Sequence, residues 1–357
     1  MSQGIKNSQL ADLIATTLPD LPKNRFEVAF DYENYEVCNR WFREDRVDVD
    51  GGTHIERNIM LDDSGNARYV RLFQTSSINV ADVQKKISIP WCQLETHWSM
   101  ERREVLRNRN NAKGFIKLIK SRRVDGMISL ANLIEQRAWK TPQNANDDLY
   151  PFGLPYWICM ANAGVTGEGF IGQTARFQDG STTTVIAGMD AAAHDKWRNY
   201  AATYTTFNAT VIKKMRKLFT AIQFKQPMLV KDLEQGPLSN YRIYMGLDEV
   251  TEFETMAEAQ NDNLGPDLAK FQGVTTFRRV PVVYIPLLDD DQYDPIYFIN
   301  HNKFYPVVQE DDWLVESEPM SDRLQHNVIT TFVDGSHQFL CTNRRVGGGV
   351  LHKPIAA

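Results

Sequence analysis

Three glycines near the middle of the chain have the spacing of a phosphate-binding loop. The segment GEGFIG places Gly167, Gly169 and Gly172 in the pattern G-x-G-x-x-G. In dinucleotide-binding proteins this loop follows a strand and opens a helix, because the helix N-terminus holds the pyrophosphate. The residues after Gly172, QTARFQDGSTTTV, are turn formers and β-branched threonines, which do not predict a helix. We therefore predict a turn-rich loop whose glycines serve backbone shape, and no bound cofactor.

An acidic run at residues 289–294 contains the letters D-D-x-x-D, which occur at magnesium–diphosphate sites. Such sites need carboxylates that converge on one metal ion from a helix. Here Pro286 and Pro295 bracket the run, and both flanking segments have strand-like composition. We predict an exposed acidic turn, and the sequence leaves open whether this turn binds a cation.

Two further pairs of potential ligands do not indicate a metal site. Cys92 and His97 fall on one predicted strand, where a spacing of five places them on opposite faces. Asp190 and His194 have the i, i+4 spacing of a helix, which we interpret as an N-cap and a surface histidine. The chain also lacks G-x-S-x-G, H-E-x-x-H and Walker patterns. We predict no catalytic and no metal-binding residues.

The composition is that of a globular protein with an acidic balance. The 357 residues carry a net charge of −5, and no long basic run suggests a sequence-reading nucleic-acid binder. No segment approaches the roughly 20 apolar residues that span a bilayer, and the first residues lack a secretory pattern. The chain has no C-x-x-C, so we predict that its cysteines are buried and reduced: Cys38, Cys92, Cys159 and Cys341.

Residues 46–73 predict a long β-hairpin. Two runs, 55–61 and 67–73, alternate with period two on either side of the turn sequence DDSGN. The predicted hairpin is charged and has no fully apolar face. Because an isolated hairpin is marginally stable in water, we expect it to pack against something outside the subunit, such as another copy.

The following residues predict a long helix and then a mixed region. Residues 100–140 repeat apolar side chains with a period close to 3.6, and about 33 helical residues would extend roughly 50 Å. Residues 143–190 predict an irregular excursion, followed by a helical region that Asp190 begins. Further predicted elements are helices at 208–224 and 250–263 and strands at 87–99, 241–247 and 280–288, with more strands towards the C-terminus.

Several stretches in this order resemble one family. They are GMDAAAHDKWRN (188–199), VIKKMRKLFTAIQFKQP (211–227), FRRVPVVYIPLL (277–288) with PIYFINHNKFYPVV after it, and HQFLCTNRRVGGGVLHKP (337–354). Together with the preceding hairpin and long helix, they resemble the major capsid protein of tailed bacteriophages of the Hong Kong 97 type. The resemblance implies an α+β fold with an N-terminal arm, an E-loop hairpin, a peripheral domain with a spine helix, and an axial domain.

The resemblance also implies a division of the chain and a function. The expected parts are an arm and lead-in (1–44), the E-loop (45–76), the peripheral domain with the spine helix (77–142), the axial domain with a variable loop region (143–275), and closing strands of the peripheral domain (276–357). The implied protein is structural and not an enzyme. It forms hexamers and pentamers of an icosahedral shell that encloses double-stranded DNA without reading its sequence.

The implied location is the virion, after assembly in the cytoplasm of a bacterial host. The implied partners are further copies of the chain, a scaffolding protein, a portal and a decoration protein, without a membrane. Two alternatives remain at this point: an encapsulin-like nanocompartment shell of the same fold, and a nucleotide-binding enzyme that uses residues 167–172. For the shell, we predict that four charged residues of the hairpin form contacts between subunits: Arg57, Asp62, Arg68 and Arg71.

Overall fold

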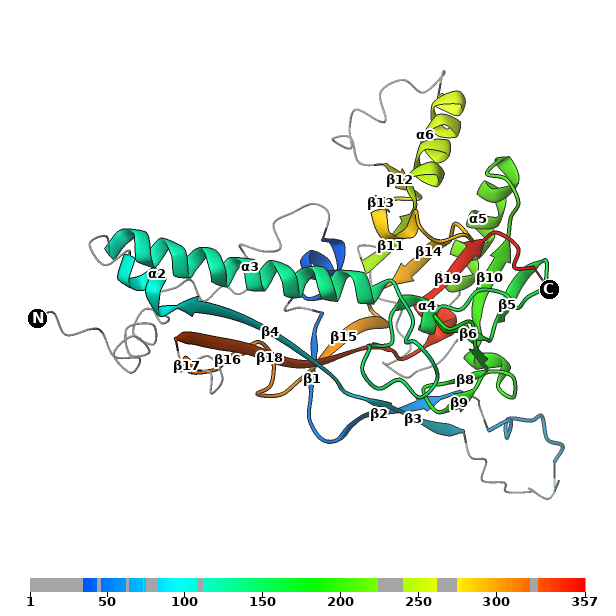
Figure 1. Ribbon diagram of the computed structural model, residues 1–357. Helices are drawn as coiled ribbons and strands as arrows, with labels where there is room; N and C mark the ends of the chain where they lie inside the picture. The colour runs from blue at the N-terminus through cyan, green and yellow to red at the C-terminus, as the bar shows by residue number, and fades with distance from the viewer. Residues whose placement is uncertain are drawn as a thin grey trace, which may run out of the picture. The chain divides into compact units, whose positions relative to one another are not determined.

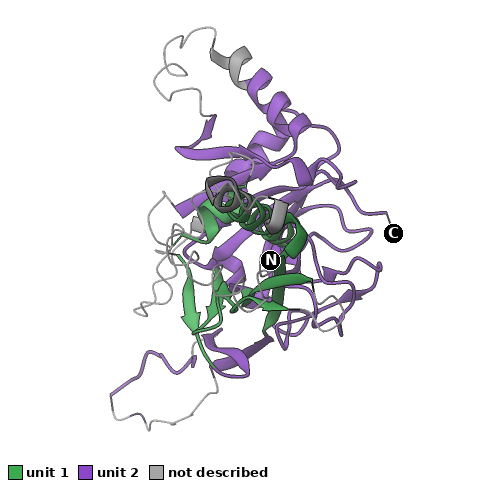
Figure 2. Ribbon diagram, turned by 60° about the vertical axis from the view of Figure 1, so that its left-hand side comes forward, with its two compact units in different colours: residues 1–51, 91–138, 306–338 green, residues 52–90, 139–305, 339–357 purple. Residues whose placement is uncertain are grey.

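The structure, a computed structural model, describes residues 35–43, 46–61, 64–72, 74, 83–107, 112–223, 240–261, 275–321 and 327–356. The chain divides into two compact units, each built from three segments (Figure 2). Unit 1 contains residues 1–51, 91–138 and 306–338, and unit 2 contains residues 52–90, 139–305 and 339–357. Residues 1–34 of the predicted N-terminal arm lie outside the described residues.

Unit 1 is built around one long helix and a sheet (Figure 1). The helix α3 (Ala112–Ala138) follows the short helix α2 (Arg102–Arg107), so the prediction of a long helix over 100–140 is confirmed for most of its length. Its apolar stripe is buried where the structure describes side chains, at Ile119, Met127, Leu130, Ala131, Ile134 and Ala138. The stripe has the spacing of one helical face, as the sequence predicts.

The sheet of unit 1 is held together by its longest strand pair. Strand β18 (Val328–Cys341) pairs antiparallel with β4 (Cys92–Glu101), from Val328 opposite Glu101 to His337 opposite Cys92. The remaining strands are β1 (Asp48–Asp50), β15 (Phe304–Gln309), β16 (Val315–Glu316) and β17 (Met320–Ser321). Helix α3 packs against β4, and Thr96 Oγ1 of β4 donates to the carbonyl of Gly126 in α3 at 3.2 Å.

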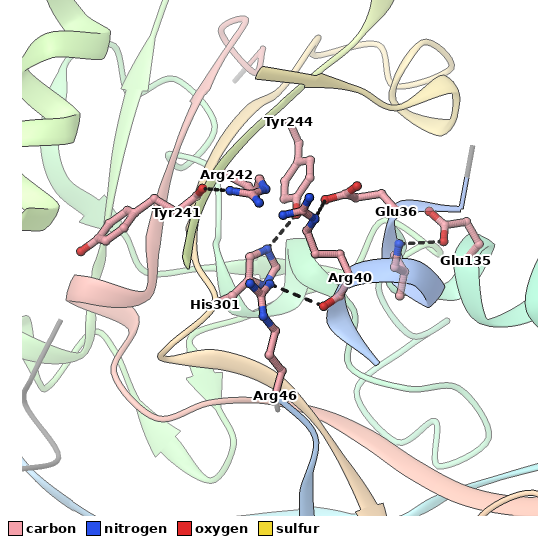
Figure 3. Close-up of polar contacts among 9 residues, drawn as sticks. Glu36, Arg40, Arg46, Glu135, Tyr241, Arg242, Tyr244 and His301 are labelled. Carbon is pink, nitrogen blue, oxygen red and sulfur yellow. Dashed lines mark hydrogen bonds and ion pairs between the residues drawn. The ribbon is translucent and has the colours of Figure 1, made fainter. Parts of the chain in front are cut away.

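A short π-helix, η1 (Val37–Trp41), packs against α3 in unit 1. The backbone N–H of Val37 donates to Glu135 Oε2 at 3.0 Å, which satisfies one of the free donors at the start of that helix. Arg40 and Glu36 form an ion pair at 3.6 Å on the same turn (Figure 3). The lead-in to the chain is therefore tied to the long helix at this point.

Unit 2 contains a seven-stranded sheet in the order β12-β13-β11-β14-β19-β10-β5. Its strands are β5 (Glu168–Gly172), β10 (Asn199–Thr203), β11 (Tyr241–Met245), β12 (Thr276–Phe277), β13 (Val280–Tyr284), β14 (Ile296–Asn300) and β19 (Gly348–His352). Helices α5 (Ala209–Gln223) and α6 (Leu247–Asn261) contribute to one apolar core with this sheet. Both helices, and the strands β11 and β13, lie where the sequence predicts them.

The sequence predicted residues 276–357 as one region, whereas the two units divide this segment. Residues 306–338 lie in unit 1. Residues 276–305 and 339–357 lie in unit 2, where they supply β12, β13, β14 and β19 of the large sheet. The strand at 87–99 is likewise two strands, β3 (Gln84–Pro90) and β4, which belong to different units.

The predicted hairpin partner was wrong. Strand β2 (His54–Met60) pairs antiparallel with β3, and the described residues of the run 67–73 are not in a strand. The register joins Ile55 to Ile89 and Arg57 to Ile87. An antiparallel partner is selected by how well the two faces bury apolar area. In the observed pairing both isoleucines of β3, Ile87 and Ile89, are fully buried.

Residues 143–190 are more regular than predicted. They contain helix α4 (Leu154–Trp157), the edge strand β5 and two small ribbons, β6 (Ala175–Arg176) with β7 (Thr182–Thr183), and β8 (Val185–Ile186) with β9 (Met189–Asp190). Asp190 does not begin a helix, which corrects the prediction. It ends β9, and its side chain accepts from the N–H of Ala192 at 2.9 Å to close a turn.

Candidate functional site

The base of the β2–β3 hairpin has one buried apolar face. Ile55, Ile59, Ile87 and Ile89 are all buried. The expectation of a hairpin without an apolar face was therefore wrong for this part. The backbone N–H of Ser88 also donates to the carbonyl of Ala187 at 3.3 Å, which fixes the hairpin to the β8–β9 ribbon of the same unit. The chain itself holds the base of the hairpin in place.

The opposite face of the hairpin base is polar. Lys86 and Glu56 form an ion pair at 2.5 Å between the two strands. Arg57 points the other way, on the face of Ile55 and Ile59, and its Nη1 donates to the carbonyl of Glu56 at 3.0 Å. Arg57, one of the four charged residues predicted to contact another subunit, is thus half-buried at the base of the hairpin and does not lie on its exposed face.

The segment beyond β2 is exposed. Tyr69 and Leu72 are 105% and 88% exposed, and Val70 is 60% exposed. Arg68 and Arg71 are exposed in the same segment, whereas Asp62 lies outside the described residues. Large apolar side chains gathered in an exposed segment are typical of an interaction surface. The sequence analysis missed this group because it placed Tyr69 in a strand paired with β2.

The glycine motif forms strand β5 and not the predicted loop. This strand is at the end of the large sheet and pairs antiparallel with β10. The next element is strand β6, so the prediction that no helix follows Gly172 is confirmed. A Cβ on Gly172 would lie 2.5 Å from the carbonyl oxygen of Cys159, and Gly169 has a φ of +146°. These glycines serve close packing and backbone shape.

A buried arginine lies directly behind this strand. Arg344, in the short helix α7 (Arg344–Gly347), has 0% exposure. Its Nε donates to the carbonyl of Trp157 at 2.6 Å and its Nη1 to that of Trp197 at 2.7 Å. Its Nη2 donates to Asn199 Oδ1, the Gly172 carbonyl and Cys159 Sγ at 2.9, 3.3 and 3.1 Å.

One guanidinium therefore joins α4, β5, β10 and the helix η2 (Asp195–Trp197). Each of these acceptors is neutral, so the arrangement binds protein groups to one another and offers no reacting centre. Sequence reasoning did not single out Arg344, because an arginine in a single sequence is normally read as a surface residue. The neighbouring glycines of GGG were the available signal, since they indicate a crowded backbone.

The acidic run 289–294 forms a turn between η6 (Pro286–Leu288) and β14, as predicted, but of its aspartates only Asp289 and Asp290 are exposed, and the other two are half-buried. Three of its four carboxylates have protein partners. Asp289 Oδ1 accepts from the N–H of Leu247 at 2.7 Å, and Asp294 pairs with Lys353. Burial raises the pKa of Asp291. Within the described ranges, no group of His, Cys, Asp and Glu side chains has the arrangement of a metal site.

One buried polar pair joins two elements of unit 2. Tyr244 and His301 share a hydrogen bond of 2.7 Å, which joins β11 to the turn after β14 (Figure 3). Cys92 and His97 both lie on β4, where the predicted spacing places them on opposite faces. All four cysteines are buried free thiols, as predicted. None of the helices in the described part of the chain has the length and apolarity needed to cross a membrane.

Comparison with known proteins identifies the fold. No protein-family model and no curated protein matches this sequence. Among solved structures, one similar chain is in the cyanophage A-1(L) capsid asymmetric unit, at 12% identity and a TM-score of 0.57, covering 87% of this chain and 91% of that chain. Another is in the capsid of a native GTA particle, at 11% identity and a TM-score of 0.50, covering 88% and 89%.

These similarities define the class of architecture: over most of its length, this chain shares the fold of the capsid chains that it matches. The fold is the Hong Kong 97-type capsid fold, as the sequence resemblance implied. The identities are too low for individual residue roles to be transferred from those chains. The roles of particular residues must therefore be argued from this structure.

Proposed function

We propose that the chain is a structural major capsid protein that self-assembles into the icosahedral shell around a phage double-stranded DNA genome. The observation that carries the proposal is the shared fold, which extends over 87% of this chain and 91% of the cyanophage capsid chain. Coverage of both chains means that the likeness includes both compact units, and not one common motif. The exposed apolar segment beyond β2 gives independent support, because an assembling subunit needs such a surface.

The proposal includes the finer predictions. The protein acts without catalysis, resides in the virion after assembly in the host cytoplasm, and has scaffolding, portal and decoration proteins as further partners. Residues 45–76 act as an E-loop: β2 within it is fixed by pairing with β3, and its distal part lies on a neighbouring subunit. The long helix α3 is the spine of the peripheral domain. The axial domain comprises the predicted residues 143–275 and extends to β12, β13, β14 and β19, which belong to the same sheet.

The direct test is electron microscopy of the purified full chain. We expect closed particles of regular diameter in negative stain, alone or after addition of a scaffolding protein from the same source. A chain that stays monomeric under both conditions, while it is folded by circular dichroism, would contradict the proposal.

A second test addresses the distal segment. Tyr69→Ser with Leu72→Ser removes two exposed apolar side chains that bury nothing within the subunit, so we expect an unchanged melting temperature of the subunit and a large loss of particles. Val49→Ser is a matched control, because Val49 is an exposed apolar residue, at 60%, in unit 1. Normal particle yield from the double variant would refute the role of the segment.

The four predicted contact residues are tested by charge reversal. Arg57→Glu, Asp62→Lys, Arg68→Glu and Arg71→Glu are each expected to alter particle yield more than the subunit melting temperature. Arg57 is half-buried, so its variant requires the melting control most. If all four variants give the wild-type yield, these residues do not form the proposed contacts.

A further inference from the structure

Two helices of unit 2 carry opposite charges. Helix α5, with the sequence ATVIKKMRKLFTAIQ, contains four basic residues and no acidic residue. Helix α6, with the sequence LDEVTEFETMAEAQN, contains five acidic residues and no basic residue. A solvent-exposed helix normally mixes both signs, because i, i+4 pairs of opposite charge stabilise it. The complete separation of charge therefore needs an explanation outside each helix.

The basic side chains of α5 face solvent. Lys213, Arg216 and Lys217 are exposed, on the side opposite the buried Met215 and Leu218. Lys217 pairs with Glu168 of β5. Lys213 and Arg216 form no ion pair with any residue that the structure describes. A cationic stripe is thus left available on this helix.

The acidic side chains of α6 are arranged similarly. Asp248, Glu252 and Glu254 are exposed, whereas Glu249 is buried. Glu254 accepts a hydrogen bond from Thr275 Oγ1 at 2.5 Å. Asp248 and Glu252 have no ion-pair partner among the described residues. This helix presents an anionic stripe that matches the cationic stripe of α5 in its number of available charges.

The two helices share one layer but lie towards different ends of the sheet (Figure 1). Helix α5 packs on β10 and β19, and its Lys217 reaches β5 at one end. Helix α6 packs on β13, next to β12 at the other end. Phe277 of β12 contacts both Phe219 of α5 and Phe253 of α6, so a single apolar core fixes the helices to the same face.

This placement selects a particular kind of contact between copies. A two-fold contact whose axis passes through either helix would bring like charges together, which is unfavourable. A head-to-tail contact brings α5 of one copy against α6 of the next, and such contacts close into a ring when the rotation allows. We infer that α5 and α6 form the electrostatic contact between neighbouring subunits within the rings of the shell. The inference deepens the proposed function and rests on it.

Nucleic acid is the other anionic partner that α5 could take. A phosphate backbone would use the cations of α5 and would leave the acidic face of α6, in the same layer, without a role. A second copy of the chain uses both faces at once, and charge complementarity favours it. The partner of α5 is therefore another subunit. Nucleic acid is the alternative partner, and the experiments below distinguish the two.

The strength of the contact should depend on salt. A single exposed ion pair contributes little, but the same contact recurs at each boundary in a ring. Exposed charges are screened beyond a Debye length, which falls from about 10 Å at 0.1 M salt to about 3 Å at 1 M. We expect ring and shell formation to be strongest at low salt, with a dependence that is lost when the charges are removed.

Charge exchange tests the pairing. Arg216→Glu alone and Glu252→Lys alone each place like charges at the contact, and we expect each to lower shell yield about tenfold or more, the effect of a modest like-charge penalty per contact. The double variant restores opposite charges in reverse order and should recover most of the yield. Lys140→Glu, an exposed lysine outside both helices, is the matched control. Failure of the double variant to recover any yield would overturn the inference.

A disulfide tests proximity directly. Subunits with Arg216→Cys and subunits with Glu252→Cys are mixed, assembled and oxidised, and a covalent dimer is expected from the mixture but from neither variant alone. The native cysteines are buried and give little background. Shells that form without this dimer would overturn the inference and leave the proposed function standing. If the wild-type chain forms no assembly at all, the proposed function itself fails.

The DNA content of the shells identifies the other partner. If Arg216→Glu shells form in normal yield but retain less DNA, then α5 contacts nucleic acid and the inference is overturned. If DNA content per shell is unchanged while yield falls, the subunit contact is supported.

Discussion

Replacing Arg344 with methionine tests whether one buried guanidinium holds unit 2 together. The side chain has 0% exposure and donates to the carbonyls of Trp157 and Trp197 and to Asn199 Oδ1 at 2.6 to 2.9 Å. Methionine fills similar space but donates no hydrogen bond. The variant therefore leaves the two buried carbonyls without this donor, whereas Asn199 Oδ1 still accepts from the N–H of Cys159 at 3.0 Å.

The magnitude follows from those acceptors. Each buried polar group without a partner costs about 1–3 kcal/mol. Two carbonyls lose their donor, and Asn199 Oδ1 loses one of its two donors. Part of this loss is offset, because the wild-type chain also bears the desolvation of the arginine charge. We expect the free energy of unfolding to fall by about 4 kcal/mol. In a unit of roughly 150–250 residues this corresponds to a melting temperature lower by about 8–16 °C.

The assay is urea denaturation of dissociated subunits, followed by tryptophan fluorescence, because Trp157 and Trp197 lie beside the substituted residue. Arg345→Met is the matched control. The Arg345 guanidinium is half-buried and stacks on Phe170, 3.9 Å from the ring centroid, so its loss should cost about 1 kcal/mol or less. The reasoning is refuted if Arg344→Met is no more destabilising than Arg345→Met.

Three further predictions concern unassembled subunits. Gly172→Ala should destabilise unit 2 by about 3 kcal/mol or more, because an added Cβ would lie 2.5 Å from the Cys159 carbonyl. Gly126→Ala should stabilise α3 by about 0.5–1 kcal/mol, because an added Cβ fits there and alanine favours a helix. Thermal melts of the two variants measure both effects. Burial lowers the pKa of His337 to about 4, so below pH 6.5 the unfolded chain binds a proton that the folded chain does not. The free energy of unfolding should therefore fall by about 3 kcal/mol as the pH is lowered towards 4. Urea titrations at several pH values should show this dependence in the wild type and not in His337→Gln. Burial raises the pKa of Cys341 to about 12, so thiol reagents should label it only after unfolding, and rapid labelling of native subunits would contradict its position.

The helices were predictable because their burial follows one period. In α5, the residues that the sequence placed on one face are all buried in the core: Val211, Ile212, Met215, Leu218, Phe219 and Ile222. That signal is local, since every residue that defines it lies within 12 positions of the others. The same holds for α3, whose apolar stripe needs no information about the rest of the chain.

The strand partners were not predictable, because they depend on residues far apart in sequence. The turn sequence DDSGN predicted a local hairpin, but β2 pairs with β3, which contributes Ile87 and Ile89 to the buried face. Strand β5 was missed because glycine is a poor strand former. Its glycine at 172 is required by the approach of Asn199 and Cys159, which only the folded chain brings together.

The two kinds of contact in this subunit suit different tasks. The interior of unit 2 is fixed by buried hydrogen bonds of Arg344, which are lost only when the unit unfolds. The proposed contacts between copies are exposed charges and a few apolar side chains, each weak alone and screened by salt. A growing shell must release wrongly placed subunits before it closes, and weak contacts allow this because dissociation rates set most differences in affinity. A rigid subunit with weak, directional contacts can therefore correct errors during assembly and become stable only when many contacts have formed.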